Sequence, residues 1–433
     1  MLFGRCATWR LCLAIFFLGG NAIAEESIPS SEKVAAFGMH EVRGKHLRLI
    51  TDLPLDDEIR SLPKVFDAAI PQWQSYFGKE VDNLQEWKAV AALIGDRQKF
   101  VDIGMLTKNI PNFKEGYQAG GRLFVMEQPS PYYRRHLLLH EGTHWFMANL
   151  FGGNGPTWYM EGMADLLATH AWDGERIELA ILPKRSEDVP YWGRVKVIKE
   201  QLQSKQAPSL DAIMKIQGSA RMEVEAYAWS WAACVFFTHH PQGKEVLRAI
   251  ASKKLDYSDQ LNKDLVEQLK ADWPRIKATW EGFASELDYG YDLARAFPAP
   301  NRQSKPMADK QKKVEIDAGL GWQSTGVIVQ RGQKIRLQSS GRYRVVREDG
   351  DWLAEPNGIT LRYIDDHPLG MLMATVVAPP KPGELVTRKW KVVPIGRDAT
   401  LECEEAGELL LKINDRASEL ADNDGRCQVV IGQ

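Results

Sequence analysis

The segment His140-Glu141-Gly142-Thr143-His144 constrains this chain more than any other. On an α-helix, residues four apart lie above one another on one face, so the two imidazoles can reach a single ion. Zinc takes histidine nitrogens at about 2.0–2.1 Å, and Glu141 would lie beside the metal, where it can take a proton from water. The motif also arises by chance, so its surroundings have to support it.

The flanking residues predict a pair of helices. Ser130-Pro131 is a suitable N-cap and first helical position, and Gly152-Gly153 is a suitable end. After a turn at Asn154-Gly155-Pro156, a second apolar helix carries Glu161 and Asp165 four residues apart. Two antiparallel helices joined by a short turn can bring Glu161 to the third corner of a tetrahedral zinc site and leave the fourth corner to water.

These residues resemble the thermolysin-like gluzincin metallopeptidases, in which His-Glu-x-x-His is followed by a glutamate helix. The resemblance implies that His140, His144 and Glu161 are zinc ligands and that Glu141 is the general base. It also implies that Asp165 orients the first histidine ligand, His140, without contacting the metal itself. As architecture the resemblance covers roughly residues 45–290, but it is specific only over residues 130–170. An inactive metal site with the same residues is the alternative.

The same resemblance implies an edge strand that pairs with the substrate backbone just before the active-site helix. The residues at that place are Leu123, Phe124, Val125, Met126 and Glu127. An ordinary core strand explains them equally well.

Gluzincins also use a Tyr or His to stabilise the tetrahedral oxyanion. Tyr227, His239 and His240 are the candidates, and we prefer Tyr227 because it is predicted inside a helix. Tyr159 lies on the wrong side of its helix relative to Glu161. His136 is too far along its helix to add a third ligand, so we expect a packed or hydrogen-bonded histidine.

The N-terminus has the pattern of a cleaved secretory signal peptide. Arg5 and Arg10 precede an apolar stretch at residues 11–18, and Ala22-Ile23-Ala24 matches a cleavage site. The next long apolar run, residues 228–237, is too short to cross a bilayer. We therefore expect a mature protein from about Glu25, secreted or periplasmic, with no transmembrane segment.

The composition and the position of a Pro-rich segment predict two domains. The net charge of −2, with both signs interspersed, gives no indication of a nucleic-acid partner. We expect an α+β metallopeptidase domain over residues 25–297 and a Pro-rich and Lys-rich linker over residues 298–313. Short β-rich runs over residues 314–433 predict an all-β antiparallel sandwich.

The C-terminal domain resembles the calcium-dependent galactophilic bacterial lectins in its runs Gly321-Trp-Gln-Ser-Thr-Gly326, Gly370-Met-Leu-Met-Ala374 and Leu409-Leu-Leu-Lys-Ile-Asn-Asp415. The resemblance implies calcium ligands at Asp415, Glu419, Asp422 and Asn423, although Glu419 replaces a threonine. Glu355-Pro356-Asn357-Gly358 stands where the lectins have a sugar-contacting His-Pro loop. A lectin-like fold is therefore better supported than galactose binding. Asp415 and Asp422 could also be plain turn residues.

Cys403 and Cys427 could form a disulfide if their strands are neighbours, and unpaired strand cysteines are the alternative. Cys234, in an apolar helical stretch, is expected to be a buried thiol.

Together these features predict a secreted zinc endopeptidase that acts on a peptide or glycoprotein, with a β-rich module for a glycan or the cell envelope. The alternative is a non-catalytic glycan-binding or envelope scaffold that keeps a relic zinc site.

Overall fold

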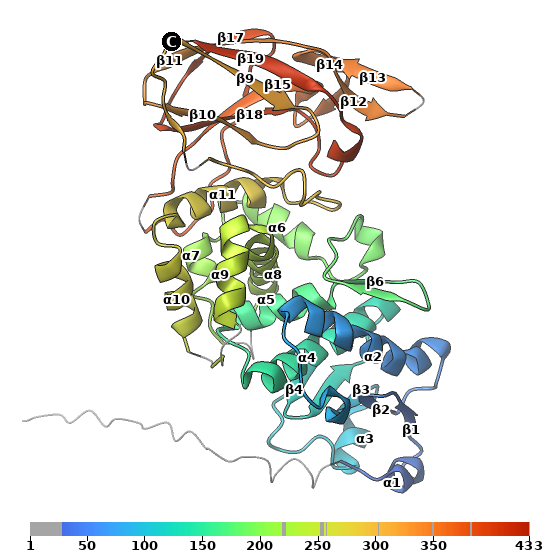
Figure 1. Cartoon of the computed structure of the whole chain (residues 1–433). Coiled ribbons are helices and arrows are strands. Elements are labelled where there is room, and N and C mark those ends of the chain that lie inside the picture. Colours follow the sequence, from blue (N-terminus) through green and yellow to red (C-terminus); the bar gives the residue numbers. More distant parts are fainter. Residues whose placement is uncertain are drawn as a thin grey trace, which may run out of the picture.

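The computed structural model describes residues 28–218, 222–251, 255–256, 258–301, 303–348, 350–381 and 383–432. The predicted signal peptide lies outside the described residues. The fold is mixed α/β: an N-terminal sheet with helices is followed by a mostly helical region and then by a strand-rich C-terminal part (Figure 1). None of the helices in the described ranges is long and apolar enough to cross a membrane.

The N-terminal sheet has five strands in the order β1-β2-β3-β5-β4. Its three central strands are parallel, and the two edge strands run antiparallel to their neighbours. One face packs on the long helices α2 and α4, and the other packs on the short helices α1 and α3. The strands are β1 (His40–Arg43), β2 (Leu47–Thr51), β3 (Ala89–Ile94), β4 (Gly116–Ala119) and β5 (Arg122–Met126), and the helices are α1 (Ser31–Ala36), α2 (Asp57–Phe77), α3 (Arg97–Asp102) and α4 (Pro131–Phe151).

The middle of the chain is mostly helical. Pro274 lies in the first turn of its last helix, where proline is favoured. The elements are α5 (Thr157–Ala168), the hairpin β6 (His170–Trp172) and β7 (Ile177–Leu179), α6 (Arg194–Gln203), α7 (Leu210–Ile213), α8 (Val224–His239), α9 (Pro241–Ala251), α10 (Gln260–Gln268) and α11 (Trp273–Glu286), with short 3₁₀ turns at Leu84–Glu86 and Ser186–Asp188.

The C-terminal part contains two larger sheets whose inner residues form a shared core, exemplified by Leu337 and Ile431 from one sheet and Leu372 and Leu411 from the other. The strand-rich structure of this part agrees with the β-rich runs predicted for residues 314–433, although the runs did not include every strand. Their bounds are β8 (Lys305–Pro306), β9 (Gln311–Asp317), β10 (Gln323–Val329), β11 (Lys334–Ser340), β12 (Tyr343–Arg347), β13 (Asp351–Ala354), β14 (Asn357–Ile364), β15 (His367–Val377), β16 (Val393–Pro394), β17 (Asp398–Glu402), β18 (Gly407–Ile413) and β19 (Arg426–Gly432), with a 3₁₀ turn at Leu420–Asp422.

The predicted linker is not a bare connection. Its residues Lys305–Pro306 form β8, which pairs in parallel with β10, and β9 begins within it at Gln311.

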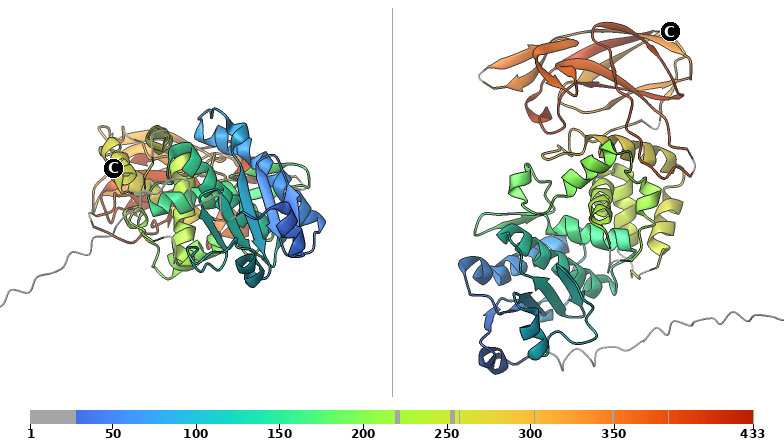
Figure 2. Two further views of the ribbon diagram at one scale, coloured as in Figure 1. Left: turned by 90° about the horizontal axis from the view of Figure 1, so that it is seen from below. Right: turned by 180° about the vertical axis from the view of Figure 1, so that it is seen from behind.

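The C-terminal part stands on α11 (Figure 2). The Arg388 guanidinium pairs through two nitrogens with the buried carboxylate of Glu281, at 3.0 and 3.1 Å. The Trp280 indole donates to Thr387 Oγ1 at 3.0 Å, and Gly282 lies against the Trp390 ring so closely that a Cβ would overlap it. Backbone bonds also join residues 207–209 to residues 385–387. The two parts therefore share a tightly packed interface.

The predicted disulfide is wrong. Cys403 and Cys427 are both buried free thiols, and their strands β17 and β19 flank β11 rather than each other. Cys403 bonds with Gln333 at the start of β11, whereas Cys427 lies beside Gly341 past its end. Eight residues of strand separate the two levels, about 26 Å at roughly 3.3 Å per residue. A disulfide needs Cα atoms within about 7 Å. Cys234 is a buried free thiol, as expected.

Candidate metal centre

The predicted helix pair forms as the sequence indicated. Ser130 caps α4 by accepting a hydrogen bond from the Tyr133 backbone, Pro131 is its first residue, and Gly152 ends it in the left-handed conformation. Both helices are almost wholly buried. Gly162 allows α5 to lie directly against α8, because a Cβ there would overlap the Ser230 carbonyl. This close packing fixes the height of α5 against its neighbours.

Three side chains from the pair converge on one point. His140 Nε2 lies 3.1 Å from Glu161 Oε2 and 3.1 Å from His144 Nε2, and His144 Nε2 lies 3.3 Å from Glu161 Oε2. All three side chains are buried. A tetrahedral zinc with bonds of about 2.0–2.1 Å holds its ligand atoms about 3.3–3.4 Å apart. The triangle therefore fits zinc in donor type and in size, and the cluster could hold a metal.

Glu141 is buried beside this triangle and against strand β4. A Cβ on Gly116 of β4 would overlap Glu141 Oε1, so the backbone of that strand passes directly over the carboxylate. Burial, with a smaller contribution from the charge of Glu161, raises the pKa of Glu141 to about 8 against the opposing effect of His144. A carboxyl group poised near neutral pH suits proton transfer.

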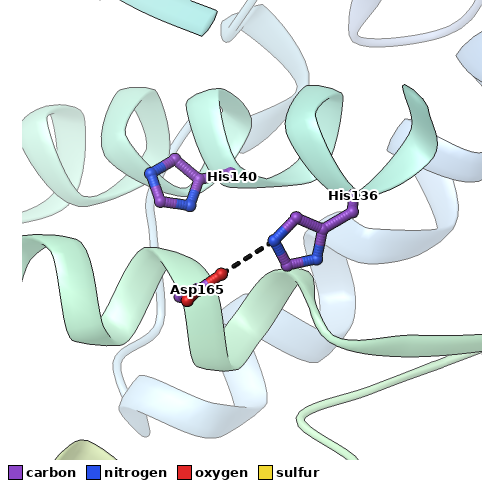
Figure 3. Close-up of side chains that lie close together, drawn as sticks. All are labelled: His136, His140 and Asp165. Carbon is purple, nitrogen blue, oxygen red and sulfur yellow. Dashed lines mark hydrogen bonds and ion pairs between the residues drawn. The ribbon is translucent and has the colours of Figure 1, made fainter. Parts of the chain in front are cut away.

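The partners of Asp165 differ from the predicted one. Its Oδ1 lies 2.8 Å from His136 Nε2 (Figure 3). Its Oδ2 accepts from Arg194 Nε at 2.6 Å. Burial opposes ionisation, but Arg194 and His136 outweigh it and hold the pKa of Asp165 below its usual value. The reason for the difference is helical spacing. His136 lies one turn before His140 on α4, and Asp165 lies one turn after Glu161 on α5, so His136 faces Asp165 as His140 faces Glu161. Asp165 therefore braces α4 through His136 rather than through His140.

The structure brings Tyr227 to the site and leaves its competitors away from it. The Tyr227 ring centre lies 6.3 Å from that of His140, and the Arg194 guanidinium lies 5.5 Å from the centre of the Tyr227 ring. His239 contacts the Val235 carbonyl, and His240 packs on Phe236. Tyr227 is thus the candidate whose ring contacts a residue of the triangle.

The prediction that residues 123–127 form the edge strand is wrong, because the edge is formed by the neighbouring strand β4. Residues Leu123–Glu127 overlap β5, which lies between β3 and β4 with neighbours on both sides. The turn at Gly120-Gly121 folds the chain into a hairpin, so β4 becomes the edge. Within the described sheet, β4 is the edge strand next to Glu141.

The predicted calcium residues gather at one loop but bond mainly to protein groups. Asn423 Nδ2 donates to Asp415 Oδ2 at 2.9 Å, the Arg347 backbone donates to Asp422, and Glu419 pairs with Arg362. Asn423 Oδ1 is buried and has no hydrogen-bond partner among the described residues. Burial raises the pKa of Asp415 to about 6. The calcium assignment stays a prediction.

Comparison with known proteins gives no family. No family model and no curated protein matches the chain. Among solved structures, a domain described as "EclA N-terminal domain; PllA-like lectin" is similar at 23% identity with a TM-score of 0.21, over 28% of this chain and 93% of that one. An aminopeptidase N family protein from Idiomarina loihiensis is similar at 11% identity with a TM-score of 0.27, over 91% of this chain and 69% of that one. At these TM-scores neither likeness carries an argument about function.

Sequence reasoning missed Arg194 and Gly116. Arg194 is the first residue of α6, about thirty positions from Asp165, and no local pattern links the two. Gly116 is the first residue of the β4–β5 hairpin, and a glycine inside a strand marks a place where another group can approach the backbone closely.

We expect Asp165→Asn to lower zinc affinity about 10–100-fold, as loss of a supporting acid does. It should also destabilise the fold by about 3 kcal/mol, because Arg194 would stay buried without its anion. Zinc titration and urea unfolding of the same preparations measure both effects. Unchanged stability would contradict a bracing role for Asp165.

Asp415→Asn should change how stability depends on pH. Folding raises the pKa of this carboxyl group to about 6. The group therefore contributes most to folding stability at pH values below its pKa in the unfolded chain, and this contribution is lost as the pH rises through 6. The variant should therefore equal the wild type at pH 4 and exceed it by about 1–3 kcal/mol at pH 8 in the presence of chelator. Denaturant unfolding at both values measures this. If the loop binds calcium, calcium at pH 8 should stabilise the wild type but not the variant. If the variant were less stable than the wild type by the same amount at pH 4 and at pH 8, the raised pKa of Asp415 would be contradicted.

Proposed function

We propose that this protein is a secreted or periplasmic zinc-dependent endopeptidase. The observation that supports it most is the triangle of His140, His144 and Glu161, whose sides of 3.1–3.3 Å match the edges of a tetrahedral zinc site. When bound, zinc would supply a Lewis acid for the scissile carbonyl and lower the pKa of water.

The other residues then have defined tasks. Glu141 accepts the proton of the attacking water and delivers it to the leaving amine, a role suited to a carboxyl group with a pKa near neutrality. Tyr227 donates its hydroxyl to the oxyanion that forms at the carbonyl. β4 is the edge strand of the described sheet, and its outer edge would pair with an extended peptide, which gives affinity with little sequence preference.

We further propose that residues 314–433 form a lectin-like antiparallel sandwich that attaches the enzyme to a glycan or the cell envelope. Two sheets around a shared core support this architecture. A non-catalytic envelope scaffold with a relic zinc site is the second candidate, and it is favoured by the match of the C-terminal loop to lectin calcium residues.

The two candidates differ in one measurement. Metal analysis of the native protein, followed by incubation of the zinc-loaded enzyme with a proteome-derived peptide library, should give one zinc per chain and new peptide termini. Glycan binding with zinc present but without new termini would favour the scaffold. A native protein without zinc would reject the catalytic proposal.

A further inference from the structure

A cavity of about 220 Å³ lies away from the metal triangle. It is enclosed by the C-terminal ends of α2, α4 and α8, by α5 and by α9. Its inner wall is apolar, with Phe151, Met163, Leu166 and Leu247 among its buried residues. An apolar concavity of this kind is the usual form of a small-molecule site.

The cavity and the metal triangle use opposite faces of α5. At about 100° per residue, Met163 and Leu166 lie roughly 200° and 140° around the helix from Glu161. Tyr159, which also lines the cavity, is placed like Met163. The cavity is therefore a separate site, although it shares a helix with the metal ligand.

The mouth of the cavity is cationic. Lys244 and Arg248 are one turn apart on α9 and both line it, together with His239. Among the described residues, no carboxylate forms an ion pair with Lys244 or Arg248. Two lining cations without an anion leave a positive charge at the mouth that an anionic group can neutralise.

A third polar group also lines the cavity. The Tyr76 hydroxyl is buried at the cavity wall, close to Thr238 and within reach of the charge of Arg248. A hydroxyl can both donate and accept a hydrogen bond, so Tyr76 adds a hydrogen-bonding group for the polar end of a ligand.

We propose that this cavity binds a monocarboxylate with an unbranched apolar tail. The carboxylate lies between Lys244 and Arg248 at the mouth, and the tail lies against Phe151, Met163 and Leu166. A cavity of about 150 Å³ holds benzene, so about 220 Å³ suits a tail of roughly eight carbons. Octanoate is the probe of that size.

Isothermal titration of octanoate into the full-length mature protein tests the proposal, with 1-octanol as a ligand of equal tail and no charge. We expect octanoate to bind with a dissociation constant on the order of 10⁻⁵–10⁻⁴ M and octanol to bind at least about 10-fold more weakly. The double variant Lys244→Met/Arg248→Met should lose at least about 10-fold in octanoate affinity. Lys263→Met, which removes an exposed lysine from the neighbouring α10, should bind like the wild type.

Ala251→Leu gives a second line of evidence, because it fills the cavity without changing charge. It should weaken octanoate and octanol alike, and its thermal midpoint shows whether the fold is intact. Octanoate that binds the double variant as tightly as the wild type would sit elsewhere, for example at the metal, and would overturn the proposal. Equal affinity for octanol and octanoate, or no binding of octanoate, would overturn it as well.

Discussion

Replacing Glu141 with glutamine should lower kcat by about 10²–10⁴-fold while the protein keeps its zinc. Glutamine has the same shape and fits the same buried space beside Gly116, but it cannot accept a proton. Glu141 is not a corner of the metal triangle, so the metal content should stay at one per chain. Peptide-library turnover and metal analysis on one preparation measure both quantities.

Glu178→Gln is the matched control, since Glu178 is an exposed carboxylate in β7. It should be as active as the wild type. If Glu141→Gln retained full activity, the proton would have to be carried by another group and the mechanism proposed above would be wrong. If the variant lost its zinc, Glu141 would be a ligand rather than a base.

Removing one of the three ligands should, unlike Glu141→Gln, cause loss of the zinc itself. We expect His144→Ala, His140→Ala and Glu161→Ala to lose more than about 100-fold in zinc affinity, beyond what loss of a supporting residue causes. Activity should fall with the metal because the donor set is incomplete.

The stabilisation of the fold by zinc is an independent measure of the loss of zinc binding. Zinc at 100 times its dissociation constant should stabilise the wild type by about 2.7 kcal/mol, and the alanine variants should gain almost nothing at that concentration. Glu175→Ala, which removes an exposed acid after the helix pair, should respond to zinc like the wild type. Equal stabilisation of wild type and Glu161→Ala would exclude Glu161 from the metal.

The sequence predicted the helix pair well because its determinants are local. Ser130, Pro131 and Gly152 specify where α4 begins and ends, and spacing alone places His140 and His144 on one face. Convergence with Glu161 needed only one short turn. These features depend on neighbours in sequence, so they could be derived before any tertiary contact was known.

Several of the errors concern relations between distant residues. The strand order that puts β4 at the edge depends on the Gly120-Gly121 turn and on the whole sheet. The separation of Cys403 from Cys427 depends on β11 lying between their strands. Arg194 reaches Asp165 from another helix. None of these pairings leaves a period or a spacing in the sequence.

The junction between α11 and the strand-rich part determines how the two parts can move. A flexible tether lets a binding module and an active site search independently, and the effective concentration then follows from tether length. Here the Glu281–Arg388 pair and the contact of Gly282 with Trp390 remove that freedom. Under the proposed function, attachment to a surface would hold the catalytic part at one fixed height and angle, so only bonds at that distance could be reached.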